Sequence, residues 1–210
     1  MRVDVRSLLS TLIVGLAGCA TPPGESPTSE PAPKATAISF LRIHFTLPAE
    51  WRGIKVDKRF SAGTGSGETL RLTAYKPPVW VVAKSGTARA VLDAYVAMIE
   101  YAHSEEADIM PLTKIMPFTP VQGACVQPSF AAVYRDSDGG YLATYVMTDR
   151  ENVYEFDFRF AGSWQSATKR YSEIVASVRW RDGALGDDTV VESIEPAKFA
   201  ELSAAQRQCR

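Results

Sequence analysis

The sequence predicts an α+β fold, in which an antiparallel β-sheet is flanked by helices, preceded by a signal peptide and a disordered linker. Three observations lead to this prediction. Several segments of strand length alternate apolar and polar residues. Two longer segments have an apolar stripe at helical spacing that follows a capping residue. Residues 1–37 show neither pattern.

Period-two alternation locates the strands. The first strand is expected at residues 38–47, where Leu41, Ile43, Phe45 and Leu47 alternate with polar side chains. The Gly-rich segment between the second and third strands is expected to form a hairpin, and the proline-containing segment before the fourth is expected to be a connector. The further strands are expected at residues 55–60, 69–75, 124–135, 141–148, 153–160 and 178–180.

The segment 153–160 has the clearest alternation. Four aromatic residues point to one side, and Glu155, Asp157 and Arg159 point to the other. Burial of each aromatic side chain contributes about 2–3 kcal/mol. The aromatic side of this strand is therefore expected to face the core.

Two helices are predicted from capped amphipathic segments. Thr87 precedes a helix that ends near residue 102, and Ser163 precedes a helix at residues 164–176. Residues 183–210 are more polar and are expected to form a tail laid against the domain. The expected apolar faces consist of Val91, Tyr95, Met98 and Ala102 in the first helix, and of Tyr171, Ile174 and Val175 in the second.

The N-terminus has the organisation of a secretory signal. Basic residues precede the apolar segment 8–17, which is about half the length of a membrane-spanning helix. The residues Leu16-Ala17-Gly18-Cys19 that follow resemble the lipobox of bacterial lipoproteins. This resemblance implies that the thiol of Cys19 carries a lipid, that the chain is cut before it, and that the new amino terminus is acylated, for example with palmitate. An ordinary signal peptide with a nearby cysteine is the alternative.

A lipidated Cys19 predicts where the protein works. Two or three acyl chains anchor a protein stably, whereas one does not. Ala20 after the cysteine points to the outer membrane, on the side that faces the periplasm of the bacterial cell envelope. The proline-rich segment that follows, up to residue 37, is expected to be an extended linker that holds the domain away from the lipid surface.

The predicted domain resembles a known superfamily. The segment Leu47-Pro48-Ala49-Glu50-Trp51 after the first strand, and the succession of strand, helix and Ser177-Val178-Arg179-Trp180 at the end, resemble the PsbP/Mog1-like superfamily. The resemblance implies an antiparallel sheet sandwiched by helices and a mostly non-enzymatic role. The predicted organisation is a lipoprotein signal peptide at 1–18, the lipidated cysteine with its linker at 19–37, the PsbP/Mog1-like domain at 38–182 and the C-terminal tail at 183–210.

Charge and cysteines restrict the function classes. The formal net charge is −1 and basic residues are spread along the chain, so nucleic acid is not an expected partner. Outside the cytoplasm, Cys125 and Cys209 are a candidate disulfide pair, and the alternative is that Cys125 is a plain buried thiol.

No pattern in the sequence predicts catalytic residues, metal ligands or a cofactor-binding motif. Ser166-Ala-Thr-Lys169 and Lys84-Ser85-Gly86 match two penicillin-binding motifs in the reverse order, and His44 and His103 lack zinc spacing. Trp80, in the apolar segment Pro77–Val82, is either buried or a contact for a partner.

Two functions follow. The first is a lipid-anchored, non-enzymatic binding or assembly module for an envelope protein partner. The alternative is a small envelope hydrolase with catalytic residues dispersed in the sequence.

Overall fold

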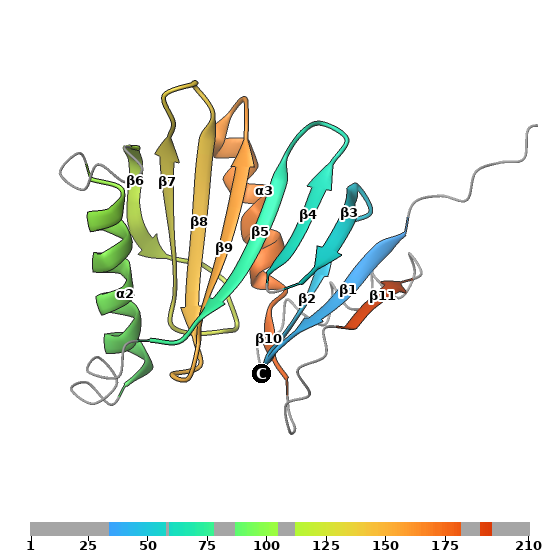
Figure 1. Ribbon diagram of the computed structural model, residues 1–210, viewed down its shortest axis with the longest axis horizontal. Helices are drawn as coiled ribbons and strands as arrows, with labels where there is room; N and C mark the ends of the chain where they lie inside the picture. Colours follow the sequence, from blue (N-terminus) through green and yellow to red (C-terminus); the bar gives the residue numbers. More distant parts are fainter. Residues whose placement is uncertain (1–33, 58, 78–86, 105–111, 182–189, 195–210) are drawn as a thin grey trace, which may run out of the picture. The chain divides into compact units, whose positions relative to one another are not determined.

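The computed structural model describes residues 34–57, 59–77, 87–104, 112–181 and 190–194. Within these residues the chain forms two antiparallel sheets and two helices (Figure 1), which confirms the predicted α+β class. The smaller sheet has the strand order β10-β2-β1-β11, and the larger has the order β3-β4-β5-β9-β8-β7-β6. The strands are β1 (Ala35–Phe40), β2 (Ile43–Leu47), β3 (Trp51–Val56), β4 (Phe60–Thr64), β5 (Thr69–Tyr75), β6 (Thr113–Pro120), β7 (Ser129–Arg135), β8 (Tyr141–Thr148), β9 (Val153–Phe160), β10 (Arg179–Trp180) and β11 (Val190–Ile194).

The smaller sheet differs from the prediction. The segment expected to be one strand at 38–47 forms two strands that pair antiparallel from Phe40↔Ile43 outward, with Leu41 at a φ of 51° in the turn. The alternation continues through this two-residue turn, so the pattern does not mark it. β1 begins within the segment predicted as linker, and β11, from the predicted C-terminal tail, pairs with it.

The larger sheet has more strands than predicted. β6 occupies the segment expected to be a connector, and its two prolines are compatible with its position at the edge of the sheet. The strand expected at 124–135 begins only at Ser129. The strand expected at 55–60 is instead the end of β3 and the start of β4. The strands predicted at 69–75, 141–148 and 153–160 have the predicted bounds.

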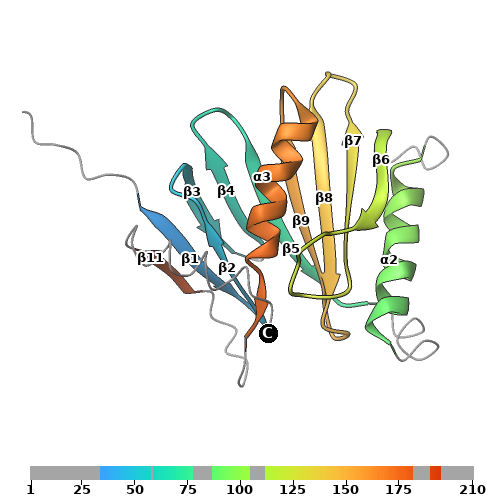
Figure 2. The ribbon, with the colours of Figure 1, turned by 180° about the vertical axis from the view of Figure 1, so that it is seen from behind.

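The two helices cover opposite faces of the larger sheet. α2 (Ala88–Ala102) packs against Phe130, Val146 and Val153, whereas α3 (Trp164–Ala176) packs on the aromatic side of β9 (Figure 2). Thr87 and Ser163 cap the helices as predicted. The buried face of α2 is rotated from the expected one, since Met98 is 50% exposed and the buried residues are Val91, Leu92, Tyr95 and Ile99. Neither helix is long and apolar enough to span a membrane within the described part of the chain.

The main core lies on the α3 side of the larger sheet. Phe158 of β9 stacks on Tyr171 of α3, with ring centroids 4.2 Å apart, and meets Trp51 and Tyr145 edge-on at 5.8 and 5.7 Å. Phe45 of the smaller sheet contacts the same core through Phe60 and Phe156. The aromatic residues of β9 therefore hold α3 and the smaller sheet on one side, as the alternation predicts.

We expect Phe158→Ala to lower the free energy of unfolding by about 3–5 kcal/mol, because the variant leaves a cavity between β9 and α3. Met98→Ala is the matched control, since Met98 is exposed and its truncation is expected to change the stability by less than about 0.5 kcal/mol. Urea unfolding followed by tryptophan fluorescence measures both. Equal losses in the two variants would contradict the assignment of the core to the α3 side.

Candidate functional site

The second face of β9 carries buried ionisable side chains. Glu155 and Asp157 point away from α3, as predicted, but they are only 9% and 6% exposed. The sequence pattern gives the direction of these side chains and not their burial. They are buried because β9 is the central strand of the larger sheet and α2 packs over its neighbours on this side.

The Asp157 carboxylate accepts hydrogen bonds from both neighbouring strands. Its Oδ2 accepts a hydrogen bond from the Arg71 guanidinium of β5 at 2.7 Å, and its Oδ1 accepts one from the Thr144 hydroxyl of β8 at 2.9 Å. The strand register places Arg71, Asp157 and Thr144 directly opposite one another. A buried charge is tolerated when it is paired and hydrogen-bonded, and Asp157 meets both conditions.

Glu155 is held in its neutral form. Burial and the nearby Asp157 carboxylate raise the pKa of Glu155 to about 8. The Tyr95 hydroxyl of α2 donates a hydrogen bond to Oε2 of Glu155 at 3.1 Å. Burial, together with Glu155, also raises the pKa of Tyr95, so Tyr95 stays a donor over the physiological pH range. The contact therefore connects α2 to the central strand through a neutral pair.

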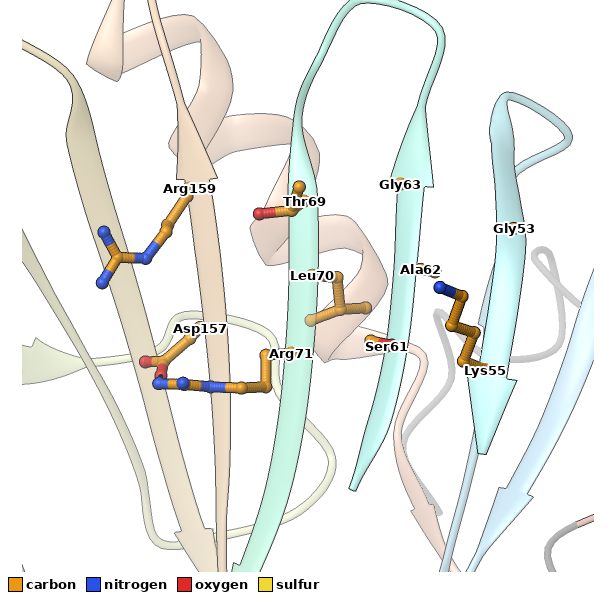
Figure 3. Close-up of a pocket in the computed structure, with 10 residues that line it drawn as sticks. All are labelled: Gly53, Lys55, Ser61, Ala62, Gly63, Thr69, Leu70, Arg71, Asp157 and Arg159. Carbon is orange, nitrogen blue, oxygen red and sulfur yellow. Dashed lines mark hydrogen bonds and ion pairs between the residues drawn. The ribbon is translucent and has the colours of Figure 1, made fainter. Parts of the chain in front are cut away.

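The part of this face beyond α2 is open and carries cationic residues. A cavity of about 420 Å³ lies over β3, β4, β5 and β9 (Figure 3). Its lining includes Ser61 and Gly63 of β4 and three cationic residues: Lys55 on β3, Arg71 on β5 and Arg159 on β9. The Arg71 guanidinium points to Asp157, and that of Arg159 points away from β4 (Figure 3). We call this surface the basic sheet face. Such a surface can bind an anionic group, since Arg and Lys recognise carboxylates and phosphates.

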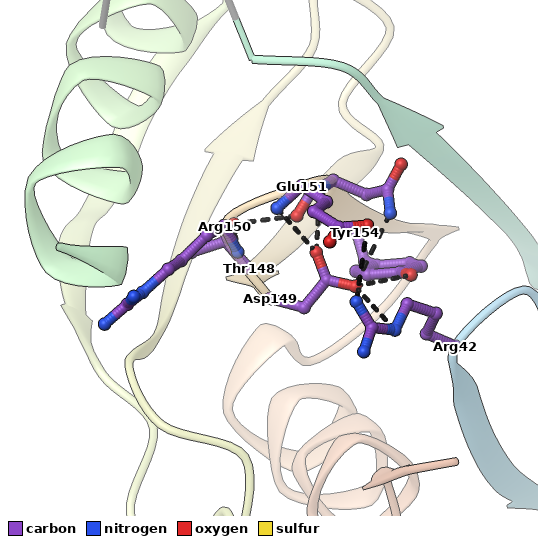
Figure 4. A network of polar contacts seen from close by, with 7 residues as sticks. Arg42, Thr148, Asp149, Arg150, Glu151 and Tyr154 are labelled. Atoms are coloured by element: carbon purple, nitrogen blue, oxygen red, sulfur yellow. Dashed lines mark hydrogen bonds and ion pairs between the residues drawn. The ribbon is translucent and has the colours of Figure 1, made fainter. Parts of the chain in front are cut away.

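A second polar network has a structural role. Oδ1 of Asp149 accepts hydrogen bonds from the backbone amides of Glu151 and Asn152 at 2.9 and 2.7 Å, and Arg42 of the β1–β2 turn lies 3.7 Å from Oδ2 (Figure 4). Tyr154 also donates to Oδ2 at 3.3 Å. These contacts fix the β8–β9 turn and link it to the smaller sheet.

Most residues that the sequence singles out cannot be placed relative to the basic sheet face, because they fall outside the described ranges. Cys19, Trp80 and Cys209 lie outside the described residues, so the lipidation and the partner contact stay predictions. Cys125 is disulfide-bonded, and its pairing with Cys209 also stays a prediction. Within the described ranges, no group of His, Cys, Asp and Glu side chains could hold a metal ion.

The two histidines are half-buried. Nδ1 of His44 lies 3.1 Å from the Ser39 hydroxyl, and the His103 ring meets Tyr134 edge-on at 4.7 Å. Burial lowers the pKa of both. The basic sheet face was missed, although Lys55 and Arg71 lie at strand positions where alternation directs them away from the core.

The comparisons with known proteins give structural similarities at low sequence identity. This chain is similar to cyanobacterial PsbP (CyanoP) from Synechocystis sp. PCC 6803, with 16% identity and a TM-score of 0.47, over 75% of this chain and 98% of that one. It is also similar to the Ran-binding protein Mog1p of Saccharomyces cerevisiae, with 9% identity and a TM-score of 0.42, over 70% of this chain and 96% of that one. No family model and no curated protein matches the chain.

The folds that the sequence resemblance names are thus among the solved structures to which this chain is similar.

We expect the stability of the protein to fall as the pH rises from about 5 to 8. The folded chain keeps a proton on Glu155 up to a pKa of about 8, whereas the unfolded chain loses it near 4.5, so the folded state binds more protons in this interval. The expected loss is roughly 2–4 kcal/mol, and Glu155→Gln removes it, because the amide keeps the hydrogen bonds without ionising. Urea unfolding at pH 5, 6, 7 and 8 measures the slope.

Glu173→Gln, at an exposed position of α3, is the control and is expected to leave the slope unchanged. A Glu155→Gln variant that retains the full slope of the native protein would show that another group causes the pH dependence.

Proposed function

We propose that this protein is a membrane-tethered periplasmic lipoprotein that acts as a non-enzymatic binding or assembly module for an envelope protein. The lipobox-like residues Leu16–Cys19 and the proline-rich segment after them support the tether. The single observation that supports the binding role is the basic sheet face. It lies on the part of the larger sheet beyond α2, and exposed cations line its cavity.

The tether and the open face fit one role. Two or three acyl chains on Cys19 hold the domain at a lipid surface, and the linker gives it reach. Tethering raises the local concentration of the domain for a partner in the same envelope, so weak contacts at an exposed surface become sufficient.

We predict that Cys19→Ser abolishes the incorporation of labelled palmitate and that a high-salt wash then removes the chain from the membrane, because the thiol that carries the lipid is gone. Metabolic labelling and fractionation measure the two effects. Ala20→Ser is the control, since it changes the neighbouring residue and keeps the thiol. An unmodified Cys19 in the native protein, detected by mass spectrometry, would refute the tether.

The binding role is tested by cross-linking in intact cells followed by affinity purification of the full chain. We expect one envelope protein to be recovered in a stoichiometric amount. Turnover of substrates by the purified chain without any partner would overturn the proposal in favour of a hydrolase.

A further inference from the structure

We propose that the basic sheet face is a docking site for an acidic, extended segment of the partner, with two or more carboxylates that lie across the strands. This inference rests on the proposed function, because it names the chemistry by which the module recognises its partner. The occupant is inferred from the charge, the spacing and the shape of the surface.

Residues that pair across β3, β4, β5 and β9 form two neighbouring rows, and both rows contain cations. The first row runs Arg52, Gly63, Thr69 and Arg159 from β3 to β9, and the second runs Lys55, Ser61, Arg71 and Asp157. Four of these eight residues are cationic and one is acidic. Opposite charges on adjacent strands stabilise a sheet, and within the two rows only Arg71 and Asp157 form such a pair. The rows therefore have an excess of positive charge.

Asp157 offsets only one of these four charges, that of Arg71. It is buried and already accepts hydrogen bonds from Arg71 and Thr144. Lys55 and Arg159 are exposed, and neither forms an ion pair with any described residue. Glu155, the next carboxyl along β9, is neutral at pH 7 because burial raises its pKa. Two cations at the cavity thus remain available for an external anion.

The distance between the cations favours an extended ligand. Lys55 and Arg159 lie on strands separated by three inter-strand spacings, which corresponds to about 14 Å between the two strands. A single phosphate or carboxylate cannot contact both ends of such a surface. An extended peptide advances about 3.3 Å per residue. Its residues i and i+4 therefore lie about 13 Å apart on the same side, which matches the span.

The shape of the face admits a backbone. Ser61 and Gly63 on β4 carry little or no side chain, so the surface is low beside Lys55. Arg71 and Arg159 line its other edge, where the Arg71 guanidinium points to Asp157 and that of Arg159 points away from β4 (Figure 3). The Arg71 guanidinium is held in place by Asp157, so part of the site is ordered before a ligand arrives. Exposed ion pairs are individually weak, and several acting together give an affinity that falls with salt.

The test uses the full chain in a neutral detergent and a fluorescent nine-residue peptide with Glu at positions 1, 5 and 9 and Ser elsewhere. Fluorescence anisotropy measures its binding at low and at physiological salt, and a peptide with Gln in place of Glu is the uncharged control. We expect the Glu peptide alone to bind, with an affinity that falls at least about tenfold at physiological salt.

The decisive variant is Ser61→Glu. It places a carboxylate opposite Lys55 and Arg71 in the register. We expect it to lower the affinity for the Glu peptide at least about tenfold, because the new carboxylate pairs with these cations. Ser166→Glu makes the same change on an exposed position of α3, on the opposite side of the sheet, and is expected to bind like the native chain.

Two results would overturn the inference. The first is equal binding of the Glu peptide by the Ser61→Glu and Ser166→Glu variants. The second is displacement of the peptide by millimolar inorganic phosphate at constant ionic strength, because this would assign the face to a single small anion. If Ser61→Glu fails to fold, Arg159→Gln replaces it, because Arg159 is exposed and unpaired among the described residues. Arg159→Gln is expected to lower the affinity for the Glu peptide about three- to tenfold.

The inference and the proposed function fail in distinguishable ways. A partner that is recovered equally by the native chain and by Ser61→Glu would leave the binding module intact and refute this docking site. Peptide binding that is lost in Ser61→Glu, together with substrate turnover in the absence of any partner, would support the site and refute the module.

Discussion

The structure depends on β9, the central strand of the larger sheet, whose two faces have different chemistry. Because successive side chains of a strand point to opposite faces, the aromatic residues of β9 are all directed to one side and the ionisable ones to the other. The aromatic side binds α3 and the smaller sheet through contacts such as Phe158–Tyr171. The ionisable side then determines how α2 and the outer strands are arranged.

Ionisable groups at the centre of a sheet must be neutralised or paired. This protein uses both solutions on adjacent positions of one strand. Asp157 is paired with Arg71 from β5, and Glu155 is neutral and hydrogen-bonded to Tyr95 from α2. α2 can therefore approach β9 closely without leaving a buried charge unpaired. Beyond α2, over β3, β4 and β5, the ionisable side is exposed and becomes the basic sheet face.

The features predicted correctly from the sequence are those that depend on local pattern. The strand at 153–160 and the helix at 164–176 have the predicted bounds, because alternation and the Ser163 cap both act within a few residues. The turn at Leu41 was missed because a non-glycine residue occupies a left-handed conformation there. The Arg71–Asp157 pair joins residues 86 positions apart, and no local pattern reports that distance. The basic sheet face depends on the same long-range register, so it follows only from the strand order.

The two halves of the polar side of β9 are electrostatically connected. If Glu155 were ionised, its charge would lie two residues from Asp157, and together they would offset the cations around the cavity. The burial of Glu155 under Tyr95 removes that charge, and Asp157 is already occupied by Arg71. The positive character of the open strands is therefore a consequence of how α2 packs on the covered strands. A substitution that loosens α2 would expose Glu155, favour its ionisation and weaken the attraction of the basic sheet face for anions, although α2 contributes no cation to it.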